Sequence, residues 1–158
     1  MRLFRKRFPV ELAVITILKD AMPFAMQKFH AENEQLPQPV TLSEATFHDI
    51  FAAMALFYLT GKCATPNVRD TDIMQRAFEA MWQYLPQFGG NADKTNQWFQ
   101  IFNSQLVEAH HQDRVKMVAD AMTEQLRLPT PVAGEFALWF FAFIVHSGLS
   151  TVDNFKLT

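Results

Sequence analysis

Hydrophobic residues recur along this chain at the spacing of amphipathic helices, and the pattern predicts five or six helices. We expect the first over residues 9–33, because one apolar stripe continues in phase across Pro23 while Pro23 falls on the opposite side. A kinked but continuous helix fits this pattern better than two separate helices. Ile17 and Phe24 would then lie beside or opposite the main stripe.

Three more helices are expected in the middle of the chain. The second opens at Thr41, where Glu44 completes a capping box, and ends near Gly61. Apolar residues on two of its faces predict that it is sandwiched between neighbours. The third, over residues 71–85, is the clearest amphipathic segment of the sequence. Asp93 is the expected cap of a fourth helix.

The last part of the chain predicts a fifth helix around residues 115–126 and a sixth over about 131–147. Whether the fourth and fifth are one bent helix or two stays open. The run from Phe136 to Val145 has no polar side chain, yet it is only about half as long as a membrane span. A helix that is apolar on every side is typical of a core position. We therefore expect an all-α, single-domain bundle of five or six helices around this central apolar helix.

Composition agrees with one folded domain over residues 1–158. Apolar residues make up 49% and charged residues 19% of the chain, which excludes a disordered protein. The 16 Phe and 8 Met against 2 Tyr are unusual, and they indicate a large core, a pocket or an adaptable interface.

Charge is unevenly distributed along the sequence. Residues 1–8 form a basic N-terminal arm with four of the 14 basic residues, so the remainder carries 10 basic and 16 acidic side chains. An acidic body argues against a nucleic-acid partner, which requires a basic face. Cys63 is the one cysteine of the chain, which fits a reducing compartment, and we expect a cytoplasmic protein without a transmembrane segment.

Two pairs of residues are candidates for metal binding. Glu108 and His111 have the spacing used by di-iron bundles, and Glu44 and His48 could contribute from another helix. In a regular helix Glu108 and His111 point away from the apolar face, and the sequence has no second Glu-x-x-His. We therefore expect no metal and no cofactor. No phosphate-binding loop, nucleophile elbow or pair of catalytic carboxylates is present, so an enzymatic activity has no support.

These observations favour a non-enzymatic helical interaction or regulatory protein that self-associates, with a further protein partner as an added expectation. The binder of an apolar small molecule or cofactor, and a peripheral membrane protein that uses the basic arm, are the alternatives. We expect a homodimer, because apolar residues occur outside the predicted core faces and such residues are enriched at interfaces. The interface candidates are Ile17, Phe24, Phe88 and Phe155.

Overall fold

The computed structural model describes residues 6–36, 39–63, 71–108, 124 and 155–158, and these residues are mostly helical. The elements in chain order are β1 (Lys6–Phe8), α1 (Val10–Thr16), the π-helical η1 (Ile17–Ala21), α2 (Met22–Asn33), α3 (Glu44–Cys63), α4 (Thr71–Tyr84), the 3-10 helix η2 (Leu85–Phe88), α5 (Ala92–Glu108) and β2 (Phe155–Leu157).

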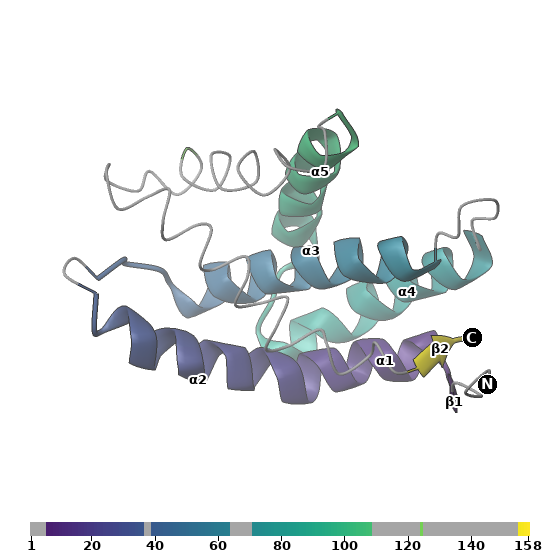
Figure 1. Ribbon diagram of the computed structural model, residues 1–158, viewed down its shortest axis with the longest axis horizontal. Helices are drawn as coiled ribbons and strands as arrows, with labels where there is room; N and C mark the ends of the chain where they lie inside the picture. The colour runs from purple at the N-terminus through teal and green to yellow at the C-terminus, as the bar shows by residue number, and fades with distance from the viewer. Residues whose placement is uncertain (1–5, 37–38, 64–70, 109–123, 125–154) are drawn as a thin grey trace, which may run out of the picture.

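Figure 1 shows how the helices are arranged. Segments α1, η1 and α2 follow one another without a break and form one long rod, as the sequence predicted for a continuous first helix. Helix α3 runs alongside this rod, α4 packs against both α1 and α3, and α5 crosses α3 on the side away from the rod. The predicted third helix is confirmed, because α4 spans Thr71–Tyr84.

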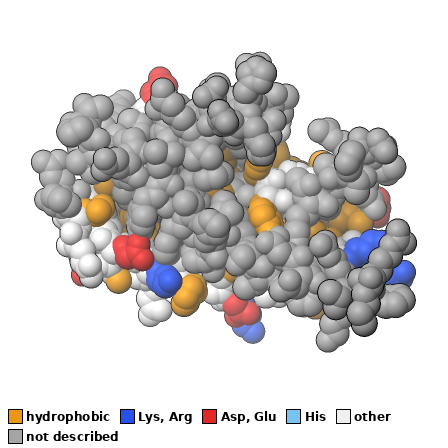
Figure 2. Space-filling model, viewed as in Figure 1, with side chains coloured by type: hydrophobic (Ala, Val, Ile, Leu, Met, Phe, Trp, Pro, Cys, Tyr) orange, Lys and Arg blue, Asp and Glu red, His pale blue; other side chains and the backbone are white. Residues whose placement is uncertain are grey.

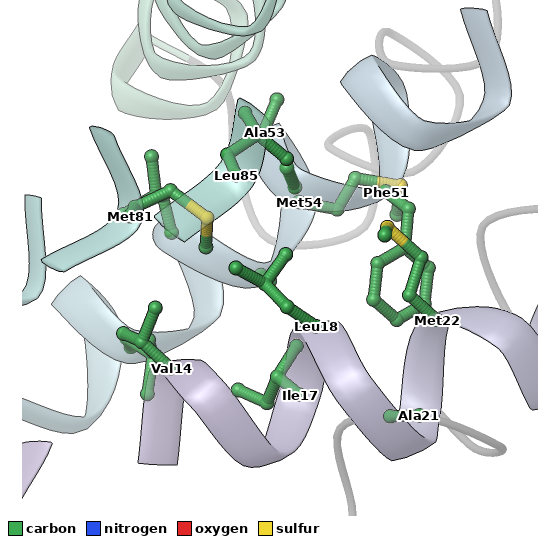
Figure 3. Close-up of a cluster of buried hydrophobic side chains, with 14 of the residues drawn as sticks. Val14, Ile17, Leu18, Ala21, Met22, Phe51, Ala53, Met54, Met81 and Leu85 are labelled. Carbon is green, nitrogen blue, oxygen red and sulfur yellow. The ribbon is translucent and has the colours of Figure 1, made fainter. Parts of the chain in front are cut away.

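Helix α3 occupies the middle of the described structure. Every residue from 47 to 56 is buried, including both the large side chains and the alanines between them. The prediction that this helix is sandwiched between neighbours is therefore confirmed. Figure 3 shows part of the core on one side of it, a cluster of buried side chains that includes Phe51 and Met54 of α3, Leu18 of η1 and Met81 of α4. The predicted central helix over residues 131–147 lies outside the described residues.

Two predicted helix caps are wrong by two residues. Helix α3 begins at Glu44, and its cap is Ser43 rather than Thr41, because the Ser43 Oγ accepts the Thr46 amide N–H at 3.2 Å. Helix α5 is capped by Asn91, not by Asp93. The Asn91 Oδ1 accepts the Lys94 amide N–H at 3.0 Å. Side chains such as Asp, Asn, Ser and Thr near the start of a helix can each act as its cap. The residue whose side-chain oxygen accepts the amide N–H three residues later takes that role.

The connection between α2 and α3 is fixed by Asn33, the last residue of α2. Its buried side-chain amide donates to the Val40 carbonyl at 2.8 Å and accepts the Val40 amide N–H at 2.9 Å. The carboxamide satisfies both polar backbone groups of Val40, which is itself buried. The extended segment that follows is thereby held against the end of α2.

A short parallel sheet joins the two ends of the described chain (Figure 1). Strand β1 pairs with β2 in the register Lys6 to Phe155, Arg7 to Lys156 and Phe8 to Leu157. Residues 6–8 of the predicted basic arm therefore form a strand, which the sequence did not predict. Leu157 is buried in the same core as the helices, and this burial explains why the strand is held there.

The strand pair also supplies backbone partners to the start of α1. The Val10 amide N–H donates to the Thr158 carbonyl at 3.0 Å, and the Thr158 N–H donates to the Phe8 carbonyl at 3.0 Å. The first amides of a helix have no partner within it, and the cap residue Pro9 offers no side-chain acceptor. The Thr158 carbonyl fills that role for Val10.

An ion pair ties these parts to α4. The Arg76 guanidinium donates to both carboxylate oxygens of Glu11, at 2.5 and 2.7 Å, and to the Thr158 carbonyl at 3.3 Å. The hydrogen bond from Arg76 lowers the pKa of the Glu11 carboxyl below its ordinary value. A bidentate pair of this kind fixes the relative position of α1, α4 and the end of β2.

Candidate functional site

The first helical rod contains a π-helical segment immediately before Pro23. The Met22 amide N–H donates to the Ile17 carbonyl, five residues back instead of four. A proline ring inside a helix has no N–H to donate and clashes with the carbonyl four residues earlier. A wider turn over Ile17–Ala21 relieves this conflict, and the rod continues through Pro23 as α2.

The π-helical turn changes which residues of the rod face the core. In a regular helix each residue is rotated by about 100° from the one before it. On that basis, the buried residues in the first part of the rod, up to the middle of η1, and those in the second part would have mean directions roughly 80° apart around the helix axis. One extra residue in the wide turn accounts for an offset of about this size. The rod can therefore bury one continuous face, made of Val10, Ala13, Val14, Ile17, Leu18, Ala21, Met22, Ala25, Phe29 and Asn33.

The prediction that Ile17 lies on the outward side of the first helix is wrong for this reason. It assumed that one regular helical phase continues across Pro23. In the structure Ile17 is 0% exposed, and Figure 3 shows it in the buried cluster beside Leu18 and Val14. Ile17 is therefore a core residue and is unavailable to a partner.

The same turn aligns residues on the outward face of the rod. Twelve residues separate Leu12 from Phe24, which would place them about 120° apart in a regular helix. With the extra residue of η1 the difference falls to about 20°. Leu12, Thr16, Asp20 and Phe24 then follow one another at intervals of four residues along one line, and Lys28 continues it. We call these five residues the outer stripe.

Two members of the outer stripe are large, hydrophobic and exposed. Leu12 is 46% exposed and Phe24 is 48% exposed, and within the described residues they are the two exposed large hydrophobic side chains. The Lys28 Nζ lies 5.4 Å from the centre of the Phe24 ring, in a cation–π contact. Near the other end, the Thr16 hydroxyl donates to the Leu12 carbonyl at 2.8 Å.

Figure 2 shows one side of this region in space-filling form. Along the lower edge, where the rod runs in Figure 1, hydrophobic side chains alternate with acidic and basic ones. The outer stripe has the same mixed character, because Asp20 lies between the hydrophobic residues Leu12 and Phe24, and Lys28 follows Phe24. Aromatic residues are enriched at interfaces between folded proteins, where a polar rim surrounds the buried centre.

The other two predicted interface residues have different surroundings. Phe88, in η2, is half-buried and packs against the core. Phe155 is the first residue of β2 and pairs with Lys6 in the sheet register. Of the four interface candidates, Phe24 is the one whose side chain the structure describes as exposed.

The metal candidates are distributed as follows. Glu44 is the exposed first residue of α3, and His48 lies one turn further on and is buried. Glu108 is the last residue of α5, and its side chain and His111 lie outside the described residues. Among the residues that the structure describes, no three His, Cys, Asp or Glu side chains come together in a group that could hold a metal ion.

The structure also contains a polar cluster that the sequence did not predict. Asp49 is buried in α3, and its Oδ1 accepts the Asn91 amide N–H at 2.7 Å and the Thr95 hydroxyl at 3.4 Å. Thr95 is fully buried. The carboxylate therefore lies at the amino end of α5, where free amides and the helix dipole favour a negative charge. This cluster fastens α5 to α3.

His48 lies beside this cluster, against the turn that leads into α5. Its buried Nδ1 has no hydrogen-bond partner among the described residues. Gly89 adopts a left-handed conformation with φ of 89°, and a Cβ placed there would lie 3.0 Å from the His48 Nδ1. A Cβ at Gly90 would lie 2.3 Å from Leu85 Cδ1. Both glycines are needed for the close approach of this turn to the helices.

None of the helices in the described part of the chain combines the length and the apolar character needed to cross a membrane. Comparison with known protein families, with curated proteins and with solved structures finds no match to this chain.

Proposed function

We propose that this protein is a non-enzymatic helical interaction or regulatory protein that self-associates into a homodimer through the outer stripe. The observation that carries the proposal is the alignment of two exposed hydrophobic residues, Leu12 and Phe24, on one side of the helical rod. Water is displaced from such side chains when a second surface covers them, which favours association. Two-fold homodimers are the commonest assemblies that provide such a surface.

The finer architecture belongs to the same proposal. The apolar run from Phe136 to Val145 would complete a bundle of five or six helices as its central member, because a helix that is apolar on all sides requires neighbours all around it. We also infer a cytoplasmic location, since a chain with Cys63 as its one cysteine has no intramolecular disulfide to protect.

The experiment that tests self-association is the mass of the protein in solution at micromolar concentration, measured by light scattering. We expect twice the chain mass of 18.2 kDa. Phe24→Glu should return the mass to that of one chain without a change in helix content by circular dichroism, because the residue contributes little to the core. Gln83→Glu is the matched control, since it adds the same charge at an exposed position of α4.

A second variant separates the rod from the basic arm. Deletion of residues 1–5 should leave the dimer intact, because this truncation removes the charges of Arg2 and Arg5 but keeps β1. Wild-type protein that has the mass of one chain across the micromolar range would overturn the proposed function. A dimer that persists in Phe24→Glu but is lost when residues 1–5 are deleted would show that the dimer contact is made by the arm and not by the outer stripe.

A further inference from the structure

The outer stripe has a charge pattern that is complementary to itself. Phe24, its most exposed hydrophobic residue, is preceded by Asp20 four residues earlier and followed by Lys28 four residues later. Four residues correspond to about 6 Å along a helix. An acid and a base therefore lie at about equal distances on opposite sides of the aromatic ring.

This pattern matters when the rod meets a second copy of itself. In an antiparallel pair whose two-fold axis passes by Phe24, the two phenyl rings face each other. Asp20 of each copy then lies opposite Lys28 of the other copy, so both ion pairs form at once. A parallel arrangement would instead place Asp20 against Asp20 and Lys28 against Lys28. Like charges in contact across an interface are strongly unfavourable.

The geometry points to an antiparallel two-fold homodimer centred on Phe24 and closed by two reciprocal Asp20–Lys28 ion pairs. This inference rests on the proposed function, and it adds the occupant of the outer stripe, its direction and the residues that set its register. Lys28 is within reach of the proposed axis, since its ammonium group lies 5.4 Å from the centre of the Phe24 ring. Both charged residues are exposed and therefore accessible to a second copy.

The π-helical turn is part of the same inference. Without the extra residue of η1, Leu12 would lie about 120° away from Phe24 around the rod and would face a different direction. With it, Leu12 is on the same side as Phe24, three turns toward the amino end. In the antiparallel pair, Leu12 extends the contact beyond the charged residues on each side of the axis.

A charge-exchange experiment tests the register. Asp20→Lys alone should weaken the dimer by about tenfold or more, because it places two lysines opposite each other. Lys28→Asp alone should do the same with two carboxylates. The double variant Asp20→Lys with Lys28→Asp restores both pairs in reverse, and we expect its dissociation constant to return to within about threefold of the wild type. Sedimentation equilibrium measures all four proteins.

The matched control is Lys19→Asp, which makes the same charge reversal at the exposed residue next to Asp20 but off the outer stripe. It should change the dissociation constant by less than about threefold, the size expected for a charge that makes no direct contact. Asp20→Asn is a second test, because it removes one charge of each pair without repulsion and should weaken the dimer while lowering its sensitivity to salt. Circular dichroism verifies that each variant keeps the helix content of the wild type.

The outcomes distinguish this inference from the proposed function. A wild-type dimer whose single charge variants dissociate and whose double variant reassociates supports the antiparallel register. A stable dimer that is indifferent to Asp20→Lys and Lys28→Asp, or a double variant as weak as the two singles combined, overturns the register but leaves self-association standing. A wild-type protein that is monomeric overturns both.

Discussion

The side-chain amide of Asn33 forms two hydrogen bonds with the backbone of Val40. It donates to the carbonyl at 2.8 Å and accepts from the amide N–H at 2.9 Å. Asn33 ends α2, and Val40 lies seven residues later in the extended segment that leads to α3. Since both residues are buried, neither backbone group of Val40 can turn to water when the amide is removed.

Asn33→Ala should therefore lower the free energy of unfolding by about 2–4 kcal/mol, because it leaves a buried N–H and a buried C=O without partners. Urea unfolding followed by circular dichroism measures the change. Gln35→Ala, two residues further along at an exposed position, is the control and should stay within about 0.5 kcal/mol of the wild type. Equal stability of the Asn33 variant and the control would show that the two hydrogen bonds contribute nothing.

The ion pair of Glu11 and Arg76 should make stability depend on pH in the acidic range. Arg76 lowers the pKa of Glu11 in the folded state, so the pair stabilises the fold above the unfolded-state pKa of the carboxyl. The contribution is lost as the pH falls through the folded-state pKa. Glu11→Gln should therefore be less stable than the wild type at pH 7, and the difference should shrink steadily below about pH 5.

Thermal unfolding at a series of pH values measures this difference. Glu32→Gln, at an exposed position of α2, serves as the control for removal of one carboxylate. A gap between the wild type and Glu11→Gln that is the same at pH 7 and at pH 3 would mean that the titration of Glu11 has no part in it.

Asp49→Ala should cost about 1–3 kcal/mol of stability, because the Asn91 amide N–H then loses its acceptor at the start of α5. Asp49→Asn keeps an acceptor oxygen and should cost less. Asp93→Ala, an exposed residue in the first turn of the same helix, should cost under about 1 kcal/mol. Chemical denaturation ranks the three variants, and the prediction fails if Asp93→Ala is the most damaging.

Phe140→Ala tests the proposed central helix. Removal of a core aromatic side chain should destabilise the fold by about 3–5 kcal/mol. Lys116→Ala, expected on the outward side of the fifth helix, is the control. Calorimetry or denaturant unfolding measures both, and a cost below about 1 kcal/mol for Phe140→Ala is incompatible with a core position.

The purified protein should contain no stoichiometric metal. Elemental analysis after extensive dialysis measures this directly. About two iron or manganese ions per chain that disappear on Glu108→Ala would contradict the expectation, because that is the composition of a di-iron bundle site. Gln100→Ala, at an exposed position of α5, is the matched control.

Within the described residues, local periodicity was enough to predict the helices but not the details of their faces. Helix α4 was predicted almost to the residue, since its apolar and polar positions follow one regular period. The buried position of Ile17 was missed because the π-helical turn before Pro23 breaks that period, and a regular wheel cannot represent the break. Ser43 and Asn91 were missed as caps because several residues nearby had suitable side chains.

Contacts between distant residues could not be predicted from one sequence. The pairing of Lys6 with Phe155, the ion pair of Glu11 with Arg76, and the contact of Asp49 with Asn91 each depend on how helices pack. The exposed position of Phe24 was predicted. The angle around the helix between Phe24 and the main apolar stripe is large enough that the extra residue of η1 does not bring Phe24 onto the buried face. Its alignment with Leu12 required the geometry of η1.

The pairing of β1 with β2 has a consequence for the timing of synthesis. Residues 6–8 are synthesised before the described helices, but their partners at residues 155–157 follow only after those helices have been made. The hydrogen bonds from the Val10 amide N–H and the Arg76 guanidinium likewise form only after Thr158 has been made, because its carbonyl oxygen is their acceptor. The helical rod, α3 and α4 can assemble during translation, whereas the sheet that joins the two ends of the described chain is added after translation has passed residue 157.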